Sequence, residues 1–419
     1  MEAVMSRLRL SPIALVLVAV GCAHDPTASD IPPRITALPR ALTAQEQQLI
    51  QADNRFAIKL LKELDAETRD TVPNLFISPL SVATALAMTY NGAAGTTADA
   101  MRATLELDSM SVGDVNESYR SLIQLLRNLD PHVQFQIANS IWYKQGYVVE
   151  QPFLAVNHDY YDAQVTALDF TSPTAPTTIN DWVSTQTHGI IDQIIDQIPY
   201  YMRLYLIDAI YFKGDWTTQF DKARTAPRPF RLESGAVADV PTMARGMTDL
   251  RIAFRQYATI IDLPYGGAAF SMTIVVPRDT TSVSQLVNAL TLDQWNGWIE
   301  SLNTEENELF MPKFTLTNDL GLIPALSGLG MGIAFSDRDA DFTRIHTPSE
   351  LAINEVKHKS YVDVNEEGTV AAAVTEVGIG TTSVGSGPVV VDRPFLFALR
   401  ENLSGTLLFM GVIRQPPVN

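Results

Sequence analysis

The chain of 419 residues has a single cysteine, Cys22, and only six histidines. The folded part can therefore hold neither an internal disulfide bond nor a catalytic thiol. No two histidines stand at metal-ligand spacing, and we expect neither a metal site nor a cofactor. The signature motifs of serine hydrolases, zinc proteases and phosphate-binding loops are also absent, which argues against an enzyme.

Positive charge is scarce as well. The chain carries 30 Lys and Arg residues against 47 Asp and Glu residues, a formal net charge of −17, and has no long basic run. A protein that follows a phosphate or sulfate backbone needs a basic stripe. We therefore expect no nucleic-acid partner and no heparin-like cofactor.

Long apolar runs are missing too: no segment reaches the roughly 20 residues that a membrane-spanning helix needs. The apolar residues 10–20 follow Arg7 and Arg9 and lead into the sequence AVGC, which ends at Cys22. A basic start, a short apolar stretch and small residues before the cut are typical of a secretory signal. The AVGC ending resembles the lipobox of bacterial lipoproteins, in which the cysteine is lipidated. An ordinary signal followed by an unrelated cysteine is the alternative.

The signal divides the chain into three parts. We expect residues 1–21 to be a lipoprotein signal peptide, residues 22–42 a lipidated cysteine with a flexible tether rich in Pro, Ser and Thr, and residues 43–419 the folded domain. Such a protein is exported and touches a membrane through its lipid anchor only. It would be anchored in the bacterial cell envelope, or extracellular. Ala23 after the cysteine favours the outer membrane if the source is Gram-negative.

Helical and strand patterns alternate along the folded part without a fixed-period repeat. A capping box at residues 43–46 opens an amphipathic helix, and Ser78 with Pro79 opens an Ala-rich helix that ends near Asn91. A further cap-and-helix pattern covers residues 178–190, and strand patterns dominate after residue 204. These patterns predict one mixed α+β domain.

Residues 366–388 do not fit a compact core. More than 20 residues without a large side chain separate two predicted strands, and a connection of this length is usually disordered or functional. The first half nevertheless alternates, because Thr369, Ala371, Ala373 and the residues at 375, 377 and 379 fall on one face of a strand. A segment that suits both an exposed loop and a buried strand indicates an element with two states.

Five groups of motifs lie in order along the folded part. They are NLFISPLS at 74–81 with GAAGTT at 92–97, NDWV at 180–183 with THGI at 187–190, DAIYFKGDW at 208–216, EEGT at 366–369 with AAA at 371–373, and VDRPFLF at 391–397. Together they resemble the motifs of the serpins, the serine protease inhibitor family, over about residues 43–415. The resemblance implies a single α+β serpin domain with three β-sheets, a surrounding set of helices and an exposed reactive-centre loop at about residues 366–390.

The resemblance also implies a function: irreversible inhibition of a serine protease. The protease attacks the loop and forms an acyl-enzyme, and the freed hinge then inserts as a new strand into the large sheet. By the same resemblance the breach at the top of that sheet contains Trp216, and the shutter is the place where the central strands part. The shutter would consist of Ser78, Ser81, Asp208 and His358, and the hinge of Glu366, Glu367, Gly368, Thr369, Ala371, Ala372 and Ala373.

The composition of the hinge suits insertion. Gly368 can supply unusual hinge dihedrals, and no Pro occurs between residues 368 and 386. The face that must enter the sheet carries only Thr, Ala, Val and Ile up to residue 379, so that no charge has to be desolvated. A non-inhibitory serpin that acts as a binding protein or a protease substrate is the alternative.

The reactive bond can be located by counting. Seventeen residues counted from Glu366 place it at Thr382–Ser383, whereas counting back from Pro394 gives Ser383–Val384. All of these residues are small and uncharged, which fits an elastase-like or subtilisin-like serine protease with a shallow specificity pocket. A cysteine protease is a further possibility. We expect the inhibitor to act as a monomer.

One shutter residue departs from the family, which commonly has Asn where this chain has Asp208. The difference is either a tolerated exchange of polar groups or a buried ion pair with His358 whose strength depends on pH. On the second hypothesis, lowering the pH until Asp208 is protonated would loosen the shutter.

Overall fold

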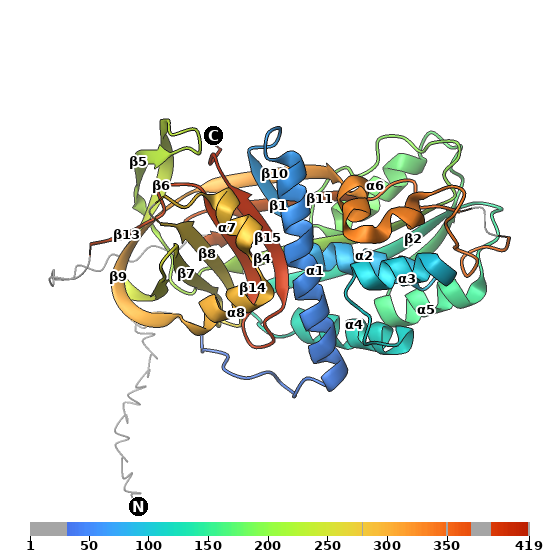
Figure 1. Ribbon diagram of the computed structural model, residues 1–419, viewed down its shortest axis with the longest axis horizontal. Helices are drawn as coiled ribbons and strands as arrows, with labels where there is room; N and C mark the ends of the chain where they lie inside the picture. Colours follow the sequence, from blue (N-terminus) through green and yellow to red (C-terminus); the bar gives the residue numbers. More distant parts are fainter. Residues whose placement is uncertain (1–31, 279, 349–350, 370–386, 418–419) are drawn as a thin grey trace, which may run out of the picture. The chain divides into compact units, whose positions relative to one another are not determined.

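The computed structural model describes residues 32–278, 280–348, 351–369 and 387–417. The chain from Pro32 onward forms one compact α+β unit, which confirms the expected fold class (Figure 1). Its helices are α1 Ala44–Thr68, α2 Pro79–Tyr90, α3 Gly95–Thr104, α4 Val112–Arg127, α5 Gln151–Tyr161, α6 Ala175–Gln186, α7 Val283–Ala289, α8 Leu292–Glu300 and α9 Ile323–Leu326. Its strands are β1 Asn74–Ile77, β2 Val133–Lys144, β3 Gln164–Leu168, β4 Leu204–Asp215, β5 Asp221–Arg231, β6 Val237–Phe254, β7 Ala258–Tyr265, β8 Phe270–Pro277, β9 Asn303–Pro312, β10 Phe314–Gly321, β11 Lys357–Val364, β12 Gly368–Thr369, β13 Val389–Val390, β14 Phe395–Glu401 and β15 Leu407–Ile413.

The two helix starts expected from the sequence are confirmed. At α1, the hydroxyl of Thr43 accepts a hydrogen bond from the backbone N–H of Glu46, and the Glu46 carboxylate accepts one from the N–H of Thr43. At α2, Ser78 caps the helix by accepting from the N–H of Ser81, with Pro79 at the first helical position. Both caps satisfy backbone donors that the first turn leaves free.

A six-stranded sheet forms one half of the framework, in the order β10-β11-β12-β4-β2-β3. Both faces of its long strand β4 are covered, because successive side chains point in opposite directions. Tyr205, Ile207 and Ala209 pack with residues of α6 in a small core, whereas Ile210 and Phe212 belong to the main core beneath the sheet. The even-numbered face of β4, which includes Asp208, therefore lies over α2, whose Ser81 side chain it contacts.

A nine-stranded sheet forms the other half. Its hydrogen-bonding order is β1-β15-β14-β8-β7-β6-β9-β13, and β5 pairs with β6. The family resemblance implies three sheets, but continuous hydrogen bonding in the described part of the chain joins the strands into two. The long strands β6 and β9 join them. Strand β6 pairs with β5, β7 and β9, and β9 also pairs with β13. The register between β6 and β9 shifts between Arg245 and Thr248.

Several segments differ from the sequence prediction. The helix expected at 178–190 begins and ends earlier, as α6. After β10 the chain forms the short helix α9, which is followed by a π-helical turn at Ser327–Met331. Residues 32–42, assigned to the tether, contact the folded unit: the N–H of Ile35 donates to the carbonyl of Gly267 at 2.7 Å. Residues 22–31 lie outside the described residues. Among the described helices, none is long and apolar enough to cross a membrane.

Candidate functional site: the hinge and the gap between the central strands

The short strand β12 lies in the middle of the six-stranded sheet. Its residues Gly368 and Thr369 pair with Asp215 and Gly214 of β4, and Thr369 also pairs with Val364 of β11. Both long neighbours are fully described, and they pair with each other at no residue. Since adjacent strands lie about 4.8 Å apart, β4 and β11 are held about two strand spacings apart by the first residues of the hinge.

Two hinge residues fit this position by size. A Cβ atom on Gly368 would lie 2.3 Å from the carbonyl oxygen of Gly214 and 2.6 Å from Cα of Asp215, so only glycine allows this close approach. Thr369 is buried, and its hydroxyl hydrogen-bonds with the phenol of Tyr265 at 2.9 Å. The side chain of Thr369 therefore points into the core.

Trp216 holds the chain that leads into β12. Its indole N–H donates to the carbonyl of Asn365 at 2.9 Å, and its backbone N–H donates to the carbonyl of Glu367 at 2.8 Å. The indole stacks on the ring of Tyr265, with the ring centroids 4.4 Å apart. The tryptophan that the resemblance places at the breach is thus in contact with the hinge.

Both hinge glutamates are buried and paired with lysines. The Glu366 carboxylate accepts from Lys313 Nζ at 2.9 Å and from the hydroxyl of Thr225 at 2.8 Å, and Glu367 pairs with Lys222. Burial raises the pKa of Glu366, but these hydrogen bonds lower it more, so that the pKa lies below its ordinary value. The hinge is therefore fixed by ion pairs as well as by backbone pairing.

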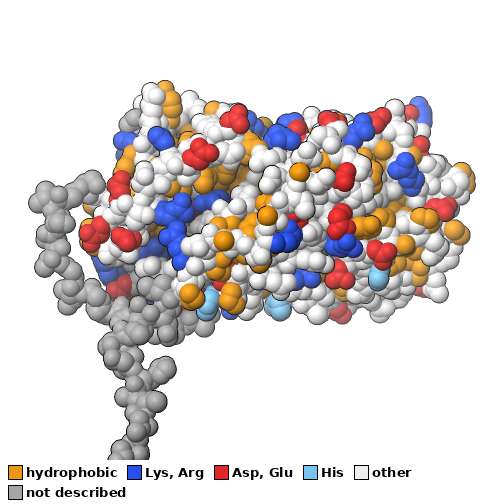
Figure 2. All heavy atoms as spheres, turned by 90° about the horizontal axis from the view of Figure 1, so that it is seen from below, with side chains coloured by type: hydrophobic (Ala, Val, Ile, Leu, Met, Phe, Trp, Pro, Cys, Tyr) orange, Lys and Arg blue, Asp and Glu red, His pale blue; other side chains and the backbone are white. Residues whose placement is uncertain are grey.

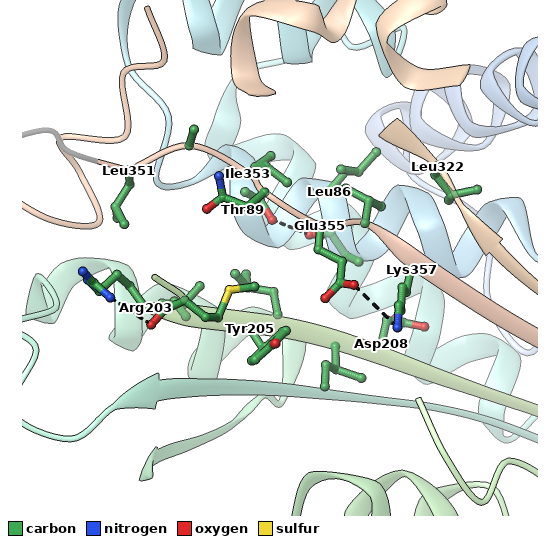
Figure 3. A pocket seen from close by; sticks show the side chains of 18 of the residues that line it. Leu86, Thr89, Arg203, Tyr205, Asp208, Leu322, Leu351, Ile353, Glu355 and Lys357 are labelled. Atoms are coloured by element: carbon green, nitrogen blue, oxygen red, sulfur yellow. Dashed lines mark hydrogen bonds and ion pairs between the residues drawn. The ribbon is translucent and has the colours of Figure 1, made fainter. Parts of the chain in front are cut away.

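Cavities follow the gap away from β12. A small one of about 20 Å³ lies between residues 210–212 of β4 and 360–363 of β11, beside Thr369. A larger one of about 570 Å³ lies between residues 203–208 and the segment 351–359, above α2. Figure 3 shows this larger cavity, with Arg203 and Tyr205 on one wall and the ion pair of Glu355 and Lys357 on the other. Cavities therefore lie between the two central strands at both of these places.

The four shutter residues meet at the wall of this larger cavity or next to it. The backbone N–H of Ser78 donates to Nε2 of His358 at 2.9 Å, and the Ser78 hydroxyl donates to the carbonyl of Leu408 at 2.8 Å. The Ser81 hydroxyl hydrogen-bonds with Oδ1 of Asp208. The serines at the start of α2 therefore connect the helix to both central strands.

The hypothesis of an ion pair between Asp208 and His358 is wrong. Nε2 of His358 accepts the hydrogen bond from Ser78 and is thus unprotonated, and burial lowers the pKa of this histidine to about 4. Burial raises the pKa of Asp208 to about 8, although the hydrogen bond with Ser81 opposes the shift, and its Oδ2 has no partner. Both groups are largely neutral at pH 7.

The reactive-bond residues Thr382, Ser383 and Val384 and the hinge residues Ala371, Ala372 and Ala373 lie outside the described residues. Beyond them the chain returns at β13, where Val389 and Val390 pair with Leu309 and Phe310 of β9. The two ends of the loop segment are therefore attached to different sheets.

Sequence reasoning missed the partners that hold the hinge. Lys222, Lys313, Tyr265 and Thr225 lie more than 50 residues before it in the chain, and no local pattern marks them. Gly214, which leaves room for Gly368, stands within the motif at 208–216 and was the only signal available.

Comparison with known proteins agrees with this geometry. Residues 51–416 match the family model described as Serpin (serine protease inhibitor). The chain is a serpin. Iripin-8 of Ixodes ricinus is 33% identical over 385 residues, 89% of this chain and 94% of the relative. Leukocyte elastase inhibitor of Xenopus laevis is 32% identical over 383 residues, 88% of this serpin and all of the relative.

A solved structure confirms the fold of this serpin. The native-state crystal structure of the thermophilic serpin tengpin superposes with a TM-score of 0.80 and 29% sequence identity, covering 92% of this chain and 97% of that one. Family members are, in general, inhibitors of proteases and not enzymes. In the described part of this serpin, no group of three or more His, Cys, Asp or Glu residues is arranged to hold a metal ion.

Proposed function

We propose that this serpin is an irreversible, suicide-type inhibitor of a serine endopeptidase. The observation that carries the proposal is the position of β12: the hinge already occupies the first places between β4 and β11, with unfilled space beyond it. A strand that continued from Thr369 would add hydrogen bonds to two neighbours at once, with its small side chains directed into the core.

The proposed mechanism couples one covalent step to this insertion. The protease serine oxygen bonds to the carbonyl carbon of the reactive residue, the peptide C–N bond breaks, and the new amino terminus takes up a proton and leaves. The loop, still esterified to the protease, is then free to continue β12. The 15 residues from Gly368 to Thr382 span roughly 50 Å as a strand, at ~3.3 Å per residue. Such a displacement carries the protease to the other end of the sheet and distorts its active site before the ester is hydrolysed.

The target we propose is an elastase-like or subtilisin-like protease, attacked at Thr382–Ser383 or at Ser383–Val384. Small uncharged residues on both sides of the bond suit a shallow pocket. Similarity to a leukocyte elastase inhibitor supports the elastase class. A non-inhibitory role as a binding protein or protease substrate is the alternative.

Covalent capture tests the inhibitor. Incubation with elastase or subtilisin is expected to give a complex of summed mass that survives denaturant. Ala371→Arg should abolish the complex and leave only cleaved chain, because residue 371 shares the core-facing alternation of Thr369 and an arginine there must lose its hydration. Ala372→Arg, on the opposite face, is the matched control and should still trap protease. Clean cleavage of the parent without a complex would favour the non-inhibitory alternative.

We also propose that the protein is a bacterial lipoprotein, exported and held in the cell envelope by lipid on Cys22. The AVGC sequence supports this, as does the absence of any other cysteine. When the parent is expressed in a Gram-negative host, we expect it in the membrane fraction. After detergent phase partition, we expect it in the detergent phase. Cys22→Ser should appear in the soluble fraction, and equal membrane association of both would exclude the lipid anchor.

A further inference from the structure

Three arginines in the described part of the chain are buried, and the guanidinium groups of two of them are paired with carboxylates. Arg400 donates from Nε to the hydroxyl of Thr273 at 2.8 Å and from Nη2 to Oδ1 of Asp262 at 2.9 Å. Arg414 forms ion pairs with Asp65, 2.5 Å from Nη2, and with Glu233, 2.7 Å from Nε, although the Nε–Glu233 contact is not aligned as a hydrogen bond. The Nε and Nη2 groups lie side by side and form a fork that matches two acceptor atoms.

Arg245 of β6 is buried to the same degree, with 4% of its surface exposed, but this edge has no acceptor. Neither Nε nor Nη2 has a hydrogen-bond partner, and no carboxylate of the described residues forms an ion pair with the guanidinium. In the described part of the chain its guanidinium lies over the ring of Phe220, whose centroid is 4.3 Å from the guanidinium carbon. A ring face attracts the cation but satisfies no N–H group in the plane of the fork.

An unpaired buried cation is costly. Burial lowers the pKa of Arg245 to about 9, a shift with no opposing contribution from a nearby carboxylate. The guanidinium still carries its charge at neutral pH. The chain therefore keeps a charged, preorganised fork without the carboxylate partner that its two other buried arginines have.

The position of Arg245 links it to both ends of the loop segment. The backbone N–H of Phe220, whose ring it covers, donates to the carbonyl of Glu366 in the hinge at 2.8 Å. On the other side Arg245 pairs in register with Leu309 of β9, which is also the register partner of Val389 in β13. A charge bound at this arginine is thus one contact away from the hinge.

The surroundings of Arg245 include a half-exposed side chain and further charged residues, which are paired with one another. Arg245 is the last paired residue before the register shift in β6, where the side chain of Met247 is about half exposed. Arg224 lies beside Gly246 and pairs with Glu308, and the lysine that pairs with Glu367 is on the same strand, β5. Figure 2 shows a group of Lys and Arg side chains left of its centre, with Asp and Glu side chains also on this part of the surface, at the end of the molecule where Figure 1 places β5, β6 and β9.

We propose that the Nε–Nη2 edge of Arg245 is a binding site for a free oxyanion such as phosphate or sulfate, which enters through the irregular part of β6. A tetrahedral oxyanion offers two oxygens at the spacing of the fork, as a single carboxylate does in a bidentate arginine pair. The bound anion neutralises the buried charge, holds the guanidinium against Phe220 and thereby stabilises the closed hinge. It acts on the intact inhibitor and needs no protease.

Melting temperatures test the site, with sodium phosphate and sodium sulfate as probes against sodium chloride at equal ionic strength. We expect both oxyanions to raise the melting temperature of the intact parent by about 2–4 °C beyond chloride, in a saturating manner. Arg245→Met keeps most of the side-chain volume without the charge; it should melt above the parent in chloride and show no extra oxyanion response. Arg245→Lys keeps the charge without the fork and should lose most of the response.

Arg228→Met is the matched control. Arg228 is an exposed arginine of the adjoining strand β5, and its guanidinium also lies over an aromatic ring, that of Phe310. We expect this variant to keep the full oxyanion response. An equal oxyanion response of parent and Arg245→Met would overturn the site, since it would be a general salt effect. A parent that melts above Arg245→Met in chloride and ignores oxyanions would also overturn it, because the chain would then supply the acceptor itself. If Arg245→Met does not fold, the comparison of the parent with Arg245→Lys decides. Because no protease is present, failure here leaves the proposed inhibition untouched.

Discussion

The indole N–H of Trp216 donates a hydrogen bond to the backbone carbonyl of Asn365, across 149 positions of sequence. This contact fixes the turn between β11 and β12, where the chain must change course before it enters the gap. The same indole stacks on Tyr265, which in turn hydrogen-bonds with Thr369. One aromatic pair therefore determines where the inserted strand begins.

Replacement of this tryptophan should loosen the hinge. Trp216→Phe removes the indole donor and leaves a buried carbonyl without a partner, at a cost of about 1–3 kcal/mol. We expect a lower urea midpoint and a faster loss of inhibitory activity on warming, as the loop inserts without cleavage. Trp298→Phe, a buried tryptophan of α8, is the control: it should lower the urea midpoint without accelerating that loss. Equal rates of loss in both variants would contradict the role of Trp216.

Gly368 should tolerate no side chain. In Gly368→Ala the new methyl would lie 2.3 Å from the carbonyl oxygen of Gly214, and relieving this overlap costs about 1–3 kcal/mol. We expect the β12 pairing to be lost, amide exchange at Thr369 to accelerate, and more inhibitor to be cleaved per protease trapped. Gly387→Ala, where the added methyl meets nothing within 4 Å, should behave as the parent. Unchanged exchange at Thr369 in Gly368→Ala would show that β12 forms differently.

The stability of the intact chain should fall as the pH rises through neutrality, the reverse of the effect expected from an ion pair. The pKa of Asp208 is about 8 in the folded chain and ordinarily about 3.9 when unfolded. The folded chain thus binds the extra proton between these values, so that the stabilisation is complete below pH 4 and lost as the pH rises to 8. Asp53, with a pKa raised to about 7 by burial, acts in the same direction.

Asp208→Asn isolates this contribution. His358, with its pKa lowered to about 4, acts in the opposite direction between pH 4 and 6.5 but is common to both proteins. The melting temperature of the parent minus that of Asp208→Asn should therefore decrease from pH 4 to 8. A difference that does not change with pH would mean that Asp208 is ionised throughout this range.

The reactive bond can be found by changing specificity. Thr382→Arg should turn the chain into an inhibitor of trypsin-like proteases, with a rate constant about 100-fold or more above the parent, because such a protease requires a cation at the residue before the cut. Ser383→Arg is the matched variant, and whichever of the two inhibits trypsin locates the bond. The mass of the released carboxyl-terminal peptide gives an independent reading. Inhibition of trypsin by neither variant would exclude both assignments.

Local sequence determined many of the elements. The capping box at Thr43 and the Ser78-Pro79 start of α2 are local signals, because a cap satisfies backbone groups within one turn. The alternation likewise predicted the burial of Thr369, since a strand repeats every two residues. Strand β5 carries little of that alternation, because nearly all of its side chains are at least partly exposed.

What the tertiary structure decided was the pairing of charges. The sequence suggested an ion pair between Asp208 and His358. In the fold, Asp208 instead hydrogen-bonds with Ser81, and His358 accepts from the backbone N–H of Ser78. The charged partner of Glu366 is Lys313. These partners lie far apart in the chain, and the desolvation that sets their protonation depends on what packs around them, which no local pattern encodes. The composition of the chain determined that the hinge could enter a sheet. Only the folded arrangement of β4 and β11 decided that there is a place for it.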